Sequence, residues 1–97
     1  MSDPEGSRSL VAAALRLIER REYAAALGPL AQAAHAAPRE PAAHFLRGVC
    51  HHGLGQLPAA LAAFDAAASL DPTHRDARYA ALAVLCQAGR ADEALRR

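Results

Sequence analysis

Apolar and polar residues alternate along this chain with the spacing of α-helices. Between Leu10 and Ile18 the apolar residues recur at intervals of three and four, which places them on one face of a helix. Similar stretches follow, separated by short segments that contain glycine or proline. The pattern predicts an all-α fold with five full helices and a truncated sixth, at residues 9–21, 23–37, 41–52, 58–70, 75–88 and 91–97.

Turn residues support these boundaries. Pro41 and Pro58 stand at first-turn positions, where the fixed φ of proline suits a helix. Gly55 and Gly89 are expected to end the third and fifth helices, because glycine readily takes the left-handed conformation that follows a helix. Thr73 is expected to cap the fifth helix, since a threonine hydroxyl can accept a bond from a free backbone N–H.

The turn positions also repeat along the sequence. Gly55 and Gly89 are 34 residues apart, and so are Pro38 and Pro72. Apolar residues share the spacing: Ala26, Ala60 and Ala94; Leu27, Leu61 and Leu95; Ala33 and Ala67. A period of this length is typical of a solenoid, in which small helical units stack and each covers the apolar face of the next.

The middle unit, residues 41–74, carries a characteristic set of small, aromatic and turn residues: Gly48, His51, Gly55, Ala60, Phe64, Ala67 and Pro72. With these residues the unit resembles a tetratricopeptide repeat (TPR), although Arg47 stands where that family usually has leucine. Residues 7–40 match less fully, because Arg21 replaces the turn glycine, and residues 75–97 form an incomplete third unit. The resemblance implies one TPR-like superhelical domain, of about two and a half repeats, at residues 9–97 after a flexible lead-in at residues 1–8.

The resemblance also implies a concave groove lined by the first helix of each unit. Such a groove would bind a protein or peptide segment, with Phe45 and Tyr79 as anchors, because aromatic side chains dominate binding energy at interfaces. Chaperone-binding members of the family hold a carboxylate with Lys, Arg and Asn. This chain has neither Lys nor Asn, so we do not expect that clamp. By the family's offsets the groove residues are Val11, Leu15, Ile18, Phe45, Val49, His52, Tyr79, Ala83 and Cys86.

Self-association is the alternative function. A repeat leaves one face uncovered, so the last unit needs a neighbour. We expect an exposed apolar face at the C-terminal end, formed by Val84, Leu85 and Leu95. In a longer parent protein the following segment would cover this face. Otherwise a second copy would cover it, and the module would be a homodimeric scaffold element.

Charge and composition limit the partners and the location. The net charge is +1, and the eleven basic residues are all arginines that alternate with ten acids. Without a basic stripe, nucleic acids and membranes are not expected partners. The N-terminus lacks the apolar core of a signal peptide, which predicts a cytoplasmic protein. The preference for Ala and Arg over Lys and Asn indicates a bacterial source. Because TPR units often precede a catalytic domain, the resemblance to that family implies the N-terminal part of a larger bacterial protein.

Residues with catalytic or metal-binding chemistry form no recognised motif. His44 and His51 are two helical turns apart, about 10 to 12 Å along the axis, which is too far to share one metal ion. Cys50 and Cys86 belong to no CxxC pair, and both are expected to be buried, reduced thiols. No nucleophile elbow, phosphate loop or carboxylate pair is present. We therefore expect no metal, no cofactor and no enzyme activity in this module, although a parent chain could carry a catalytic domain.

Overall fold

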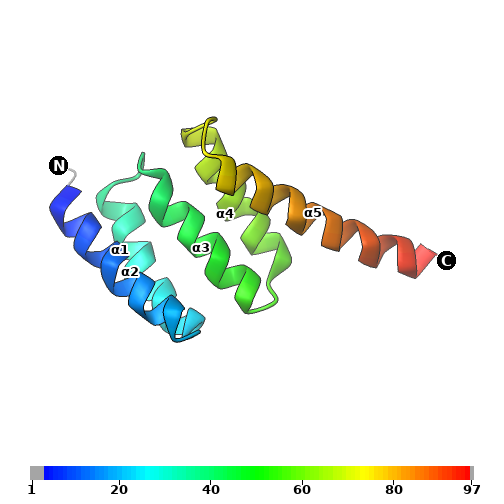
Figure 1. Cartoon of the computed structure of the whole chain (residues 1–97), viewed down its shortest axis with the longest axis horizontal. Helices are drawn as coiled ribbons and strands as arrows, with labels where there is room; N and C mark the ends of the chain where they lie inside the picture. Colours follow the sequence, from blue (N-terminus) through cyan, green and yellow to red (C-terminus); the bar gives the residue numbers. More distant parts are fainter. Residues whose placement is uncertain (1–3, 97) are drawn as a thin grey trace.

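The chain folds into α-helices that follow one another across the molecule. The computed structural model describes residues 4–96, with side chains from Gly6 to Gly89. Every regular element in that part of the chain is a helix (Figure 1), which confirms the predicted all-α fold. The helices are α1 Pro4–Glu19, α2 Tyr23–Ala36, α3 Pro41–Gly53, α4 Leu57–Leu70 and α5 Arg75–Arg96. None of these described helices is both long and apolar enough to cross a membrane.

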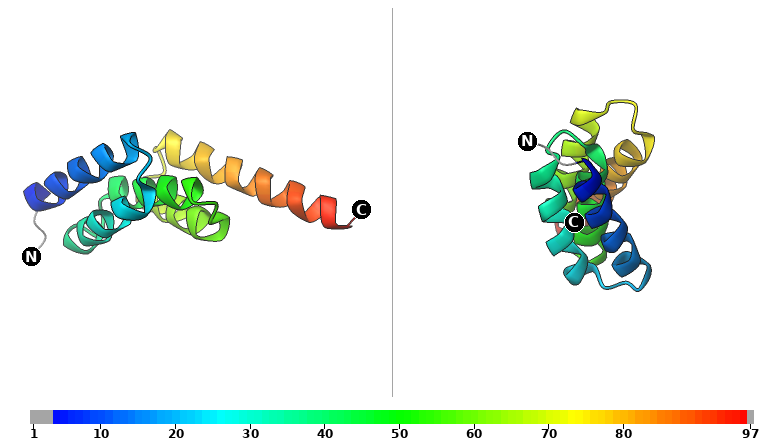
Figure 2. Two further views of the ribbon diagram at one scale, coloured as in Figure 1. Left: turned by 90° about the horizontal axis from the view of Figure 1, so that it is seen from below. Right: turned by 90° about the vertical axis from the view of Figure 1, so that its left-hand side faces the viewer.

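The helices pack as antiparallel neighbours in chain order. α1 packs on α2, α2 on α3, α3 on α4 and α4 on α5, and α1 also touches α3. Seen from below, α1 and α5 lie on one side of the molecule and α2 and α4 on the other (Figure 2). This arrangement, in which each helix pair contacts only the next one, is that of a helical solenoid.

α1 begins earlier than the sequence predicted. The helix starts at Pro4, not at Ser9, and Ser7 is only 4 % exposed. Pro4 occupies the first helical position, where its missing N–H has no partner to lose. The described part of the expected lead-in is therefore helical, while Met1–Asp3 lie outside the described residues.

Two small clusters of buried side chains form the core. The first lies among α1, α2 and α3, and the second among α3, α4 and α5. The helices cross so closely that only small residues fit at the crossing. A Cβ at Gly48 would come within 2.5 Å of the Phe64 ring. The buried members are Ala14, Ala26, Leu30 and Cys50 in the first cluster and Ala60, Phe64, Ala81 and Val84 in the second.

The turns inside the first two units use a left-handed residue at equivalent positions. Gly55 has φ 77° and lies between α3 and α4. Arg21, 34 residues earlier, has φ 61° and lies between α1 and α2. A residue with a Cβ pays about 1 to 2 kcal/mol for this conformation. The turn therefore forms even where arginine replaces glycine.

α5 does not turn at the third equivalent position. It runs through Gly89 to Arg96, so the predicted end at Gly89 and the separate sixth helix from Ala91 are wrong. Gly89 has no positive φ, and nothing lies within 4 Å of a Cβ built there. A glycine inside a helix costs only about 1 kcal/mol.

The start of α5 is capped by His74 and not by Thr73. The Ala77 N–H donates to His74 Nδ1 over 3.1 Å. The backbone N–H and the hydroxyl of Thr73 both donate to Asp71 Oδ1, at 3.1 and 2.6 Å. These bonds from Thr73 lower the pKa of the Asp71 carboxyl. Thr73 thus tightens the loop before α5, and the prediction that it caps the helix was wrong.

Candidate functional site

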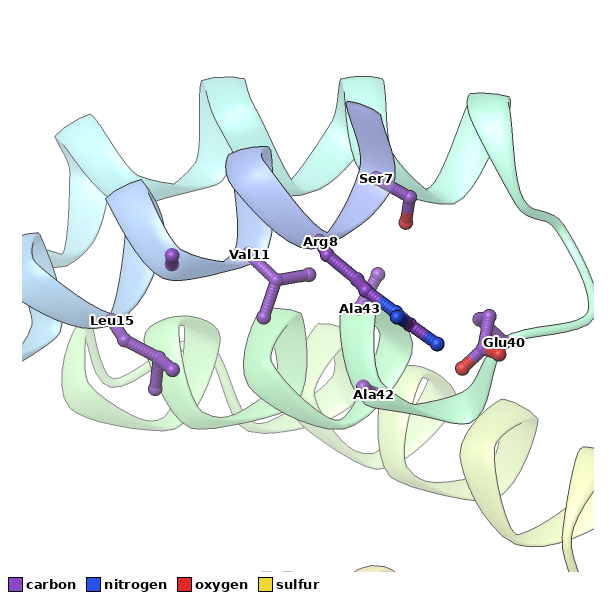
Figure 3. Close-up of a pocket in the computed structure, with 8 residues that line it drawn as sticks. Ser7, Arg8, Val11, Leu15, Glu40, Ala42 and Ala43 are labelled. Atoms are coloured by element: carbon purple, nitrogen blue, oxygen red, sulfur yellow. The ribbon is translucent and has the colours of Figure 1, made fainter. Parts of the chain in front are cut away.

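A cavity of about 250 Å³ lies between α1 and the start of α3. Figure 3 shows side chains from both helices around it, with α1 in front and α3 below. Its α1 wall repeats at steps of three and four residues, so it is one face of that helix. The lining residues are Ser7, Arg8, Val11, Ala12, Leu15, Glu40, Ala42 and Ala43.

The cavity has an apolar middle and a charged end. Val11, Leu15 and Ala43 supply hydrocarbon surface, and Leu15 is 43 % exposed. Arg8 extends from α1 toward Glu40 at the start of α3 (Figure 3). Both charged side chains are exposed, and neither makes an ion pair with a described residue. A guanidinium and a carboxylate are therefore available to a bound molecule at this end of the cavity.

The structure divides the predicted groove residues into groups. Val11 and Leu15 meet at the cavity, whereas Ile18 packs against the first core cluster. Phe45 and Val49 pack against the second core cluster. The Phe45 ring centroid lies 5.6 Å from that of Phe64 and 5.1 Å from that of His74. Phe45 on α3 is thus half-buried against α4 and the residue before α5.

The remaining predicted groove residues lie at or on α5. His52 Nε2 donates to Gln87 Oε1 over 2.9 Å, a bond that joins α3 to α5. Ala83 and Cys86 are exposed. Tyr79 is 70 % exposed and lines a second, open cavity of about 320 Å³. The described residues that line this cavity all belong to α5: Arg75, Arg78, Tyr79 and Leu82.

The predicted self-association face is only partly where the sequence placed it. Val84 is 2 % exposed and belongs to the second core cluster, so it cannot contribute to a free surface. Leu85 is 49 % exposed, and the side chain of Leu95 lies outside the described residues. The sequence identified the right helix but included a residue from its core face, because apolar residues surround much of α5.

The two cysteines differ in their surroundings. Cys50 is fully buried in the first cluster, and burial raises the pKa of its thiol, which keeps it protonated and unreactive. Cys86 is exposed, contrary to the prediction, because none of the described helices packs over that side of α5. Both are free thiols.

The histidines have structural hydrogen bonds. His44 Nε2 donates to the Pro38 carbonyl over 3.2 Å, at the loop before α3. His51 Nδ1 donates to Gln56 Oε1 over 2.7 Å, at the turn after α3. Among the described residues, no three His, Cys, Asp or Glu side chains come close enough together to hold a metal ion.

The sequence analysis missed several residues of the cavity between α1 and α3. Ser7 and Arg8 were assigned to a lead-in, although Ser7, Val11 and Leu15 follow one another at helical steps of four. Treating Pro4 as a first-turn proline would have extended the helix to include them. Glu40 was taken as a loop residue, and only the approach of α1 to α3 shows that it borders the cavity.

Comparisons with known proteins agree with this architecture. The Sgt2 TPR domain from Aspergillus fumigatus superposes with a TM-score of 0.79 at 25 % identity, over 86 % of this chain and 54 % of that one. The TPR2AB domain of yeast Sti1, in a complex with pHSP90, has a TM-score of 0.88 at 17 % identity, over 98 % of this chain and 37 % of that one. A mutant of MamA has a TM-score of 0.77 at 27 % identity, over 96 % of this chain and 68 % of that one.

The chain therefore spans about half the length of the Sgt2 TPR domain. No curated protein matches its sequence. The family model described as tetratricopeptide repeat, however, matches residues 11–75, which is most of the chain and covers both turns with a left-handed residue. Together with the stacked helix pairs, this match shows that the chain belongs to the tetratricopeptide repeat family.

Proposed function

We propose that this chain is a protein-interaction module of a bacterial cytoplasmic protein, and that it binds a peptide segment across the cavity between α1 and α3. The observation that carries the proposal is the cavity itself, an apolar hollow with Arg8 and Glu40 at one end. The Sti1 domain, which has the same fold, forms a complex with pHSP90. That likeness supports a protein or peptide as the partner.

The size of the cavity favours a peptide side chain over a small molecule. Small-molecule sites usually occupy about 300 to 1,000 Å³ and enclose most of the ligand. The cavity at α1 and α3 has about 250 Å³ and is open on one side. It suits one or two apolar side chains of a longer segment whose backbone stays on the surface.

The charged end suggests how such a segment would be oriented. A carboxylate on the peptide would meet the Arg8 guanidinium, and a basic group would meet Glu40. Val11 and Leu15 would hold the apolar side chain between them. We extend the proposed surface along the predicted groove to Phe45, Val49 and His52 on α3. In this proposal Phe45 supports the surface from its half-buried position.

A random peptide library displayed on phage is a direct probe, with the immobilised protein as bait. The best binder is then measured against Leu15→Glu by calorimetry. We expect a loss of affinity of about tenfold or more, because a carboxylate in an apolar pocket must be desolvated. Leu54→Glu is the matched control, since Leu54 lies at the α3–α4 turn and is 40 % exposed against 43 % for Leu15. Equal losses in both variants would contradict the proposed site.

A further inference from the structure

The outer surface of α5 carries a row of exposed side chains, and none of the described helices packs over it. Leu82 is 58 % exposed and Leu85 is 49 % exposed, while Tyr79 is 70 % exposed. These residues follow one another at steps of three, so they lie along one side of the helix. The opposite side, with Ala77, Ala81 and Val84, is buried. We call the exposed row the α5 stripe: Arg75, Arg78, Tyr79, Leu82 and Leu85.

The equivalent rows on α1 and α3 are covered by the next helix of the same unit. Leu82 has the same position in its unit as Ala14 and Gly48, which are 68 and 34 residues earlier and are both buried. Those two residues are small because α2 and α4 cross over them closely, and Gly48 leaves no room even for a Cβ against Phe64. Leu82 would obstruct such a crossing. The α5 stripe therefore suits a helix at the ordinary separation of about 8 to 10 Å, with leucine against leucine.

The charges along the sequence of α5 complement those of a second, antiparallel copy. Arg75 and Arg78 lie at the N-terminal end of α5, and neither makes an ion pair with a described residue. In the sequence, Asp92 follows Leu85 by seven residues, as Leu82 follows Arg75 by seven. If two α5 helices pack antiparallel with Leu82 of one opposite Leu85 of the other, the helix position of Arg75 comes level with that of Asp92 in the second copy, whose side chain lies outside the described residues. A parallel pair would instead place Arg75 beside Arg75.

We propose that the α5 stripe docks on the α5 stripe of a second copy, in an antiparallel pair related by a two-fold axis. Residues opposite each other then have numbers that sum to 167, so Gly89 faces Arg78 and leaves room for its long side chain. α5 is about 33 Å long at 1.5 Å per residue, which is enough for this overlap from Arg75 to Asp92. The interface uses a different surface from the α1–α3 cavity and leaves that cavity open.

Sedimentation velocity over a range of concentrations tests the proposal. We expect wild-type protein to be a dimer, and Leu82→Glu to weaken dimerisation about a hundredfold or more, as for a central interface anchor. Leu82 is exposed in the single chain, so the variant should keep its far-ultraviolet circular dichroism. Leu15→Glu is the control on another surface and should remain dimeric. A wild-type monomer at the highest soluble concentration, or an undiminished dimer of Leu82→Glu, would overturn the proposal.

A charge exchange tests the antiparallel register. Arg75→Glu should weaken the dimer about two- to fivefold, which is the scale of an exposed ion pair. Adding Asp92→Arg to that variant should restore the original dissociation constant. If the double variant is weaker than Arg75→Glu alone, the proposed register is wrong. Peptide binding at the α1–α3 cavity should be unchanged in all of these proteins, which keeps the two proposals separately testable.

Discussion

α3 and α5 occupy the same place in successive units and yet end differently. α3 stops at Gly53, and the chain turns back through Gly55 with φ 77° into α4. α5 reaches the equivalent Gly89 and remains helical for seven more residues, to Arg96. The face of α3 that carries Gly48 is covered by Phe64, whereas the face of α5 that carries Leu82 is open.

The difference shows that the turn glycine permits a turn but does not cause one. At Gly55 the returning helix α4 buries Ala60 and Phe64 against α3 and α5, which offsets the cost of ordering the turn. At Arg21 the turn forms without glycine, because α2 buries Ala26 and Leu30. Packing of the second helix thus decides the turn.

The largest effect is expected from giving α3 the residue that α5 has. Gly48→Leu places a large side chain where even a Cβ would lie 2.5 Å from the Phe64 ring. We expect the free energy of unfolding to fall by about 3 kcal/mol or more, the upper range for overpacking. Urea denaturation measures it. The double variant Gly48→Ala with Phe64→Leu copies the Ala14 and Leu30 pair of the first unit. Its free energy of unfolding should lie much closer to wild type than that of Gly48→Leu. A mild effect of Gly48→Leu would mean that the α3–α4 crossing is looser than described.

The two turn glycines should respond to alanine with opposite signs. Gly55→Ala forces a left-handed conformation on a residue with a Cβ and should cost about 1 to 2 kcal/mol of unfolding free energy. Gly89→Ala should increase helicity and stabilise α5 locally by up to about 1 kcal/mol, because it removes glycine from a helix interior. Denaturation and circular dichroism give both signs. Destabilisation by Gly89→Ala would indicate that this residue turns the chain after all.

The smallest effect on the free energy of unfolding is expected from replacing Arg21. Arg21→Gly relieves the left-handed strain but gives the unfolded chain more freedom, so we expect a net stabilisation of about 0.5 kcal/mol. The shift in denaturation midpoint should be small and positive. Arg21→Ala, which keeps a Cβ, is the control and should leave the midpoint nearly unchanged. A clear loss of stability in Arg21→Gly would show that the arginine side chain contributes more than its backbone costs.

The sequence predicted most of the fold because its repeat is local and periodic. Helical spacing and the 34-residue period located every boundary of α2, α3 and α4 to within one residue. The extent of α5 could not be derived in this way. Gly89 repeats Gly55 in the sequence, yet the chain turns at Gly55 and stays helical through Gly89. A pattern of turn residues contains no direct information on that difference.

The candidate site was less predictable than the fold. Val11 and Leu15 followed from the family's offsets, but Arg8 and Glu40 join the cavity only because α1 begins at Pro4 and approaches the start of α3. Val84 and Leu82 are both apolar residues of α5, and the sequence does not show which of them is buried. Their opposite exposures, 2 % and 58 %, depend on the side from which α4 packs.

The central claim is that α5 continues through Gly89 and leaves its outer face for a partner. Backbone chemical shifts of the full chain in solution test it most directly, because Cα shifts report helical conformation residue by residue. The account predicts unbroken helical shifts from Arg75 through Gly89 to Arg96. Non-helical shifts at Gly89, with a separate helix beginning after it, would contradict the claim and restore the turn seen at Gly55.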